Sequence, residues 1–203
     1  MSATFLALGD SYTIGEGVAP GERWPAQLAT RLRGEGIGIA DPQIIATTGW
    51  TTDELSAAMD AASFAPPYDL VTLLIGVNNQ YRGRPLDEYR AQFHALLQRA
   101  IKLAGGNAAH VIVVSIPDWG VMPFAARAGR DAAVVAREID AFNAAAAAEA
   151  REAGANWIDV TTLSRAPGSR GELVADGLHP SGAQYARWTE VILPDARKAL
   201  SGD

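Results

Sequence analysis

The stretch Leu70-Val-Thr-Leu-Leu-Ile75 is followed directly by Gly76-Val77-Asn78, so an almost wholly apolar run ends in a turn that carries an amide side chain. A strand with one exposed face alternates apolar and polar residues, whereas a strand covered on both faces is apolar throughout. The run Val111-Ile-Val-Val-Ser-Ile116 has the same character. Both runs therefore predict central strands of a parallel sheet.

Three further apolar runs of strand length lie at residues 4–8, 43–46 and 156–160. Helical patterns occupy the segments between the runs, and this alternation is typical of a parallel sheet with helices on both faces. No repeat, charge block or low-complexity tract interrupts it, and a chain of 203 residues fits one core better than two. We expect a single α/β domain over residues 1–203.

Local signals predict where the helices begin. Thr51-Thr-Asp-Glu54 is a capping-box pattern and starts a helix that runs to about residue 60. Pro85 fits a first helical position, while Asp131 and Ser181 are expected caps of two more long helices. A helix is also expected over residues 24–33. The inward face of the helix after Pro85 is predicted to consist of Leu86, Tyr89, Phe93, Leu96 and Ala100.

Composition excludes several kinds of chemistry. The chain has no cysteine, so disulfides, a thiolate nucleophile and a zinc site built on sulfur are all excluded. Only three histidines are present, His94, His110 and His179, which leaves little room for a metal site made of several histidines. Any imidazole chemistry must use one of these three rings.

Charge and hydropathy limit the classes of partner that the protein is expected to bind. A net charge of −6 disfavours a binder of nucleic acid or of an anionic membrane, because both need clustered Lys and Arg. The first residues have no basic segment followed by a long apolar run, and no window approaches the roughly 20 apolar residues of a membrane span. We therefore expect a cytoplasmic protein without stable membrane association, whose partner is a small molecule.

Function is expected in the loops at the carboxyl ends of the strands, where open parallel sheets bind ligands. Gly9-Asp10-Ser11 comes straight after the first apolar run, so the Ser11 hydroxyl is expected at this end of the sheet. The segment lacks the G-x-S-x-G elbow of the α/β-hydrolases. A serine in a turn also serves as a helix cap, so Ser11 alone does not decide between a nucleophile and a structural residue.

Asp176 and His179 are three residues apart, just before the last predicted helix. A tight turn at this spacing brings the carboxylate onto one imidazole nitrogen, and the other nitrogen is then available as a general base. The alternative is that Asp176 caps the turn and His179 merely precedes Pro180. The other two histidines lie within a predicted helix and just before a strand, where packed or solvated roles are expected.

Two further residues after predicted strands offer hydrogen-bond donors. Gly49 ends the second strand segment, where the missing side chain lets a backbone N–H approach a ligand. Asn78 follows the third strand and carries a side-chain amide. Taken alone, each is equally well explained as a turn residue. In a sheet of order 2-1-3-4-5 the first three strands are neighbours, so Ser11, Gly49 and Asn78 would share one pocket.

Together, Gly9-Asp10-Ser11, Gly49, Gly76-Val77-Asn78 and Asp176-Gly177-Leu178-His179 resemble the four sequence blocks of the SGNH, or GDSL, hydrolases, in the same order and over nearly the whole chain. The resemblance implies a three-layer α/β/α sandwich with a flavodoxin-like, five-stranded parallel sheet of order 2-1-3-4-5. It also implies hydrolysis of esters or thioesters with no metal and no organic cofactor.

Carried over motif by motif, the resemblance also implies residue roles. Ser11 would be the nucleophile, His179 the general base and Asp176 the acid that orients it. The Ser11 N–H, the Gly49 N–H and the Asn78 side-chain amide would form the oxyanion hole. One position departs from the family pattern, since Asn79 stands where the third block usually has an aspartate. This departure bears on the local support of that loop, while the proposed catalytic Asn78 is retained.

The substrate class is expected to be a small-molecule carboxylic ester with a short-to-medium acyl group or an aryl group, and thioesters and lysophospholipids stay open. A carbohydrate O-deacetylase of the same fold is the alternative within hydrolysis. Aromatic residues and a methionine lie beside two of the sequence blocks and in the loop after the fourth predicted strand, and they form either an apolar acyl pocket or part of the core. These residues are Trp50, Tyr81, Trp119, Met122 and Phe124.

A non-catalytic flavodoxin-like module that binds a nucleotide or a partner protein is the alternative outside hydrolysis. Its phosphate-binding turn would be Gly34-x-Gly36-x-Gly38. This segment does not follow a predicted strand and lacks the G-x-G-x-x-G spacing, so it is a weak signal. The sequence therefore favours the esterase, and it leaves the oligomeric state open.

Overall fold

The computed structural model describes residues 2–201, and its strands form one parallel sheet. The strands are β1 (Phe5–Gly9), β2 (Gln43–Ala46), β3 (Leu70–Leu74), β4 (Val111–Val114) and β5 (Asn156–Ile158). Their order is β2-β1-β3-β4-β5, and every neighbouring pair is parallel. This confirms the expected order and places β3, which is buried along its whole length, at the centre.

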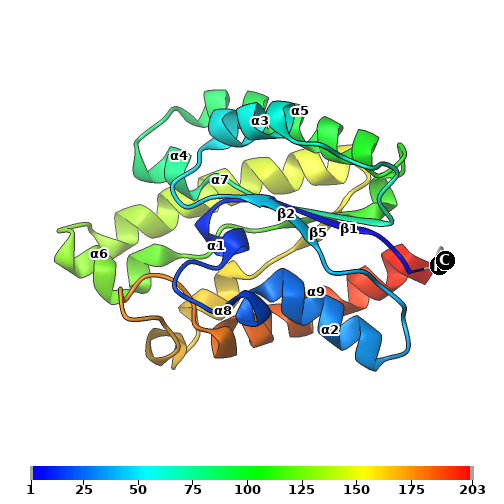
Figure 1. The fold of residues 1–203 in the computed structure, drawn as a ribbon. Helices are drawn as coiled ribbons and strands as arrows, with labels where there is room; N and C mark the ends of the chain where they lie inside the picture. Colours follow the sequence, from blue (N-terminus) through cyan, green and yellow to red (C-terminus); the bar gives the residue numbers. More distant parts are fainter. Residues whose placement is uncertain (1, 202–203) are drawn as a thin grey trace.

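Long helices cover both faces of the sheet (Figure 1). On one face lie α3 (Thr52–Ala61), α5 (Leu86–Leu103) and α7 (Ala132–Ala153). On the other face α2 (Trp24–Gly34) packs against α9 (Gly182–Ser201). The result is the expected three-layer α/β/α sandwich. Within residues 2–201, none of the helices has the length and apolarity that a membrane crossing requires.

Short helices occupy stretches in which the sequence shows no helical period. They are α1 (Ser11–Ile14), α4 (Val77–Tyr81), α6 (Pro123–Arg127), α8 (Thr161–Arg165) and the 3-10 turns η1 (Pro20–Glu22), η2 (Ala108–His110), η3 (Trp119–Val121) and η4 (Ser169–Gly171). Helices this short cannot present a repeating apolar stripe. Several follow strands closely, so the residues at the carboxyl end of the sheet sit on single helical turns.

The predicted caps are found at the starts of the long helices. The backbone N–H of Thr51 donates to the Glu54 carboxylate at 2.9 Å, which is the reciprocal bond of a capping box. Asp131 accepts a hydrogen bond of 2.9 Å from the N–H of Val134. Ser181 stands immediately before α9, and its carbonyl accepts from the N–H of Tyr185 at 3.0 Å.

The start of α5 differs from the prediction in two details. The helix begins at Leu86, so Pro85 is its N-cap and not its first residue. The pattern predicts Leu86 on the inward face, whereas its side chain is 40% exposed. Leu86 borders a groove between α5 and α7, beside Asp87 and Arg90, and the buried stripe starts at Tyr89.

Candidate active site

Ser11 is the first residue of α1, directly beyond the end of β1. Asp10 caps this short helix, because its Oδ1 accepts a hydrogen bond of 3.0 Å from the N–H of Tyr12. Gly9 is required by crowding, since a Cβ at this position would lie 2.6 Å from the carbonyl oxygen of Leu74 on the neighbouring strand. Each residue of the Gly9-Asp10-Ser11 motif therefore contributes to placing the Ser11 hydroxyl at the carboxyl end of the sheet.

Asp10 is completely buried beside Ser11. Burial raises the pKa of Asp10 to about 7, against the opposing effect of the backbone hydrogen bond from Tyr12. Its second carboxyl oxygen, Oδ2, has no hydrogen-bond partner among residues 2–201. The carboxyl group next to the candidate nucleophile is thus poised to carry a proton near neutral pH.

Asp176 and His179 form the contact that their spacing predicts. The Asp176 Oδ2 lies 2.6 Å from the His179 Nδ1, while Oδ1 accepts from the backbone N–H groups of Leu178 and His179 at 2.8 and 3.0 Å. Burial acts to raise the pKa of Asp176, but the bonds from the ring and the backbone outweigh it and lower the pKa below its usual range. The carboxylate therefore fixes the ring through Nδ1 and leaves Nε2 available for proton transfer.

Gly49 lies three residues beyond the end of β2, in a turn and not at the end of the strand. Its φ of +90° lies in the left-handed region, which a glycine adopts without strain. The guanidinium of Arg82 donates to the Gly49 carbonyl at 2.7 Å and to the Glu54 carboxylate at 3.2 Å. Arg82 thus holds the Gly49 turn against the start of α3, a contact for which the sequence carries no motif.

Asn78 is the second residue of α4, close beyond the end of β3. Its Nδ2 donates to the carbonyl of Trp50 at 2.8 Å, which ties the Asn78 side chain to the segment after Gly49. A side-chain amide carries two hydrogens, so this contact leaves one for a ligand. One hydrogen bond, from Asn78 to the residue after Gly49, therefore holds these two candidate oxyanion donors on adjoining segments.

Asn79, the departure from the family pattern, is fully buried and well supported. Its Oδ1 accepts from the N–H of Thr52 at 3.1 Å, and its Nδ2 donates to the Thr52 hydroxyl at 2.7 Å. That hydroxyl in turn donates to Gln92 of α5. The amide thus satisfies the contacts that bind α4 to α3, and the support of the loop is intact.

One cavity of about 200 Å³ brings the candidate residues together, since Ser11, Gly49, Asn78 and His179 all line it. Asp176 lies behind the ring of His179 and does not line the cavity. Among the described residues there is no hydrogen bond between the Ser11 hydroxyl and the His179 ring. Catalytic contacts of this kind are often long before substrate binds.

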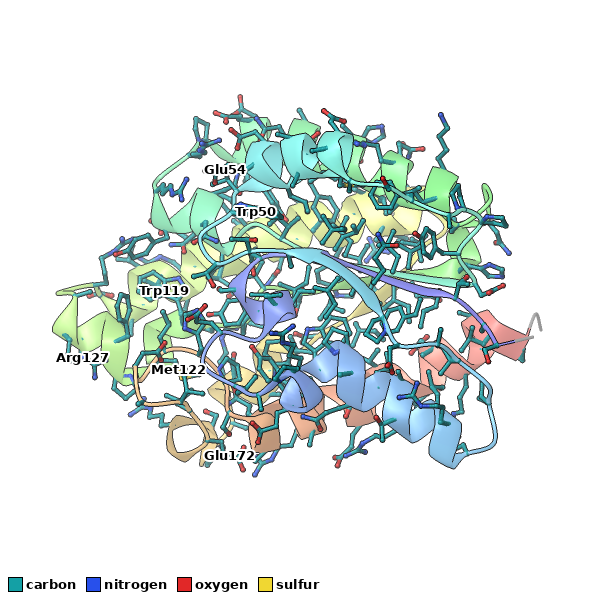
Figure 2. The ribbon with its side chains drawn as sticks, in the orientation of Figure 1. Trp50, Glu54, Trp119, Met122, Arg127 and Glu172 are labelled. Atoms are coloured by element: carbon teal, nitrogen blue, oxygen red, sulfur yellow. The ribbon has the colours of Figure 1, made fainter. Side chains whose placement is uncertain are left out.

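The aromatic residues that the sequence leaves open divide between pocket and core. Tyr81, Trp119 and Phe124 line the cavity. Trp50 is half-buried against the core and Met122 is buried, and neither residue lines the cavity. Figure 2 shows Trp50 and Trp119 at the same end of the molecule, the end at which α1 and α6 lie.

Tyr12 is a lining residue that the motif analysis missed. It follows the first block directly, its ring centroid is 5.6 Å from that of His179, and it packs against Trp188 of α9 with centroids 6.0 Å apart. Its position directly after Ser11 is the only signal that the sequence offers. The Tyr12 ring supports the imidazole from the side of the core.

The remaining histidines lie away from the cavity. The Nδ1 of His94 is 2.8 Å from the Glu149 carboxylate, between α5 and α7, and His110 ends η2 before β4. In the part of the chain that the structure describes, no three His, Asp or Glu side chains converge as metal ligands. The imidazole in the cavity is that of His179.

Comparison with known proteins agrees with this geometry. The sequence model of the GDSL-like Lipase/Acylhydrolase family matches residues 7–187. The crystal structure of TesA is 25% identical with a TM-score of 0.74, and the match covers 97% of this chain and 99% of that chain. A lipase/acylhydrolase from Enterococcus faecalis is 21% identical with a TM-score of 0.73, over 97% and 96% of the two chains.

A variant of Axe2, an acetyl xylan esterase from Geobacillus stearothermophilus, shares the fold at 19% identity and a TM-score of 0.71, over 97% of this chain and 96% of that chain. No curated protein matches the chain. The family match includes all four sequence blocks, from Ser11 to His179, and it sets aside the non-catalytic module. The chain belongs to the GDSL-like lipase/acylhydrolase family and is an ester-hydrolysing enzyme.

Proposed function

We propose that this enzyme is a serine esterase in which Ser11 is the nucleophile and His179 the general base. Asp176 orients the ring of His179 and stabilises its positive charge. The Ser11 N–H, the Gly49 N–H and the Asn78 amide are the oxyanion donors. The observation that carries the proposal is one cavity lined by Ser11, Gly49, Asn78 and His179, with Asp176 bonded to the far nitrogen of the ring.

In the proposed cycle, the Nε2 of His179 takes the hydroxyl proton while the Ser11 Oγ attacks the ester carbonyl carbon. The negative oxygen of the tetrahedral intermediate accepts hydrogen bonds from the three donors. The Asp176 carboxylate stabilises the imidazolium, which then protonates the leaving alcohol as the ester bond breaks. Water attacks the acyl-enzyme by the same route, releasing the acid and restoring Ser11.

The shape and chemistry of the cavity support a small apolar ester as substrate. Pockets for drug-sized ligands hold about 300–1,000 Å³, so a cavity of about 200 Å³ suits one short group of an ester. Aromatic and aliphatic side chains, among them Tyr81, Trp119 and Phe124, line it together with the polar groups of the candidate catalytic residues. Short-to-medium acyl esters and aryl esters fit this arrangement, and compact thioesters or lysophospholipid acyl ends share the same chemistry.

Deacetylation of carbohydrates is the second candidate. It is favoured by the likeness in fold to Axe2, an acetyl xylan esterase. An acetyl group fits the cavity, but the rings on its wall offer little hydrogen bonding to a sugar. Turnover of p-nitrophenyl esters of increasing chain length, compared with turnover of acetylated xylo-oligosaccharides, separates the two functions.

The proposal is tested by labelling with a fluorophosphonate, which reacts with activated serines. We expect the parent to be labelled at Ser11, and we expect Ser11→Ala to lose both the label and the hydrolysis of p-nitrophenyl acetate. Ser63→Ala, which changes an exposed serine elsewhere, serves as the matched control and should keep both. Equal turnover by Ser11→Ala and the parent would show that the nucleophile is wrongly assigned.

A further inference from the structure

Three aromatic side chains form one wall of the cavity. The rings of Tyr81 and Trp119 meet edge to face with centroids 5.4 Å apart, and those of Trp119 and Phe124 do so at 6.1 Å. The centroids of Tyr81 and Phe124 are 6.4 Å apart, so each ring contacts the other two. Tyr81 ends α4, whereas Trp119 begins η3 and Phe124 lies in α6. We call these three rings the aromatic wall.

A chain of polar contacts behind the wall holds Trp119 in place. The indole N–H of Trp119 donates to the Gln80 Oε1 at 2.8 Å, and the Gln80 Nε2 donates to the Glu138 carboxylate at 2.6 Å. Glu138 pairs with the guanidinium of Arg130 at 3.7 Å. The guanidinium carbon of Arg130 then lies 5.3 Å from the Trp119 ring and 5.8 Å from the Tyr81 ring, so the chain of contacts closes on the wall.

The chemistry of these three side chains, Trp119, Gln80 and Glu138, allows only one arrangement of the Gln80 amide. The indole N–H of Trp119 can only donate, and the Glu138 carboxylate can only accept. The amide of Gln80 must therefore turn its oxygen to the tryptophan and its nitrogen to the glutamate. Gln80 is 3% exposed and Trp119 is 2% exposed, so a broken contact would leave a buried polar group without a partner. The indole is thus fixed in both position and orientation.

Arg130 fixes the exposed side of the wall. Its cation lies within cation–π distance of two rings that come from different elements, α4 and η3. Tyr81 is 44% exposed, so its ring is held in a single conformation only if a group contacts it on the solvent side. The Arg130 cation supplies that partner, and Glu138 keeps the cation over the rings.

We propose that Gln80 and Arg130 are positioning residues that set substrate selectivity, by holding the aromatic wall as a preformed slot for the apolar group of a small ester. This inference rests on the proposed esterase function and deepens it. The recognised chemistry is an aryl group or a short alkyl chain, on the acyl or on the alcohol side of the ester. Neither residue lines the cavity, so both act through the rings and not on the reacting atoms.

A preformed apolar slot favours esters that fill it over esters that do not. One additional methylene in such a pocket is worth about 10- to 200-fold in kcat/KM. If the three rings become mobile, part of this gain is lost, because binding of an apolar group must then also restrict the motion of the rings. The expected signature is a change in the preference between substrates, with the reactivity of Ser11 retained.

The test compares Gln80→Leu and Arg130→Met with the parent on two substrate pairs. p-Nitrophenyl acetate and hexanoate vary the acyl side, and ethyl and benzyl acetate vary the alcohol side. We expect the parent to prefer the larger member of at least one pair. Both variants should lower that preference about fivefold or more, Arg130→Met because it removes two cation–π contacts and Gln80→Leu because it removes the acceptor of the Trp119 indole N–H. The pair in which the preference falls identifies the side of the ester that meets the wall.

Controls separate the wall from general damage. Arg137→Met removes an exposed arginine of α7, seven residues after Arg130, and should leave both preferences unchanged. Arg130→Lys keeps a cation and should retain more of the preference than Arg130→Met. If Gln80→Leu does not fold, the comparison at the partly exposed Arg130 still decides the question, with fluorophosphonate labelling as the check that Ser11 is active.

The outcomes distinguish the two proposals. A parent without preference in either pair, or variants with unchanged or increased preference, would overturn the role of the wall while labelling of Ser11 persists. Absence of labelling at Ser11 in the folded parent would overturn the esterase mechanism itself. A lowered preference in Gln80→Leu and Arg130→Met, with Arg137→Met equal to the parent, supports the inference.

Discussion

Burial of Asp10 makes the stability of the folded protein depend on pH. In the unfolded chain its carboxyl has an ordinary pKa near 3.8, while burial in the folded protein raises the pKa to about 7. Between these values the folded protein holds a proton that the unfolded chain has lost. The stability contributed by the neutral carboxyl is therefore complete below about pH 4, and it is lost as the pH rises through 7.

We predict that Asp10→Asn flattens this pH dependence. The asparagine keeps the Oδ1 acceptor for the N–H of Tyr12 and cannot ionise. The free energy of unfolding of the variant, relative to the parent, should improve between pH 5 and pH 7.5 by on the order of 2–4 kcal/mol. Urea denaturation at the two pH values measures it.

Asp41→Asn is the control for Asp10→Asn, because the Asp41 side chain is 88% exposed in its contact with Arg33. Its stability relative to the parent should be nearly the same at both pH values. A relative stability of Asp10→Asn that also stays constant would show that Asp10 is ionised throughout this range.

The contacts of Asn79, the residue that departs from the family pattern, suit an amide better than the aspartate that is usual there. Restoring the aspartate would place a carboxylate between the N–H and the hydroxyl of Thr52, and no cation is among the partners of the Asn79 side chain. The hydroxyl would have to turn to the carboxylate and leave the Gln92 oxygen. We predict that Asn79→Asp lowers the free energy of unfolding by about 1–3 kcal/mol at pH 7.5.

Thermal unfolding of Asn79→Asp at pH 5 and 7.5 checks this prediction, because a buried carboxylate is tolerated better when protonated. The variant should be closer to the parent at pH 5. Equal stability of the variant and the parent at both values would mean that Thr52 and Gln92 rearrange without loss.

Residue type and local spacing were sufficient to predict one part of the site and not another. Asp176 and His179 meet because three residues of turn separate them, which the sequence shows directly. Gln80 instead contacts Trp119 and Glu138, which are 39 and 58 positions away. No local pattern encodes such contacts, since they depend on how α4, η3 and α7 pack.

At the scale of the elements, length decides what the sequence reveals. α7 carries an N-cap at Asp131, a left-handed glycine at Gly154 and enough turns for an apolar stripe, and it is found as predicted. α1 and α4 have 4 and 5 residues, so they show no period and are predicted only as loops. They form because each follows a strand whose position in the sheet is fixed, so tertiary structure and not local propensity determines them.

The start of α4 depends on a glycine. Gly76 has a φ of +131°, and a Cβ there would lie 2.5 Å from the ring of Tyr89. Gly83, beyond the end of the same helix, also has a positive φ of +67°, but a Cβ there would meet nothing within 4 Å. Both positions have a positive φ that disfavours an L side chain, but only Gly76 is also crowded.

We predict that Gly76→Ala lowers the free energy of unfolding by about 2–4 kcal/mol, whereas Gly83→Ala costs about 1 kcal/mol. Chemical denaturation of both variants measures the difference. Because Gly76 delivers Asn78, its alanine variant should also lose more esterase activity at temperatures where it is still folded. Equal losses of stability would mean that the ring of Tyr89 yields to the added methyl group.

At the scale of the whole molecule, the site is assembled from both ends of the chain. Ser11 follows β1 near one end, and His179 precedes α9 near the other, so neither side chain is placed until the sheet and α9 are in position. The loop that carries Asp176 and His179 is bonded at several points. The N–H of Val174 donates to the His179 carbonyl at 2.9 Å, and the N–H of Phe124 donates to the Gly177 carbonyl at 3.1 Å.

These hydrogen bonds predict that the reactivity of Ser11 is lost at the same urea concentration at which the protein unfolds. Trp24 of α2 and Trp188 of α9 are fully buried, so tryptophan fluorescence reports the packing of these helices on the sheet. Brief fluorophosphonate pulses along a urea titration report whether Ser11 is still activated. We expect the two transitions to coincide, as they do when a structure opens in one cooperative step.

The opposite result would also be informative, because loops near active sites often open before the core. If labelling fell at a lower urea concentration than the fluorescence changed, the loop from Val174 to His179 would be a separate, less stable unit in spite of its backbone bonds. The same titration on Arg127→Met would then locate the weakness, since Arg127 of α6 donates to the Asp176 carbonyl and its loss should shift only the labelling transition. A single transition in the parent instead means that the loop with Asp176 and His179 is lost in the same cooperative step as the packing of α9 against α2.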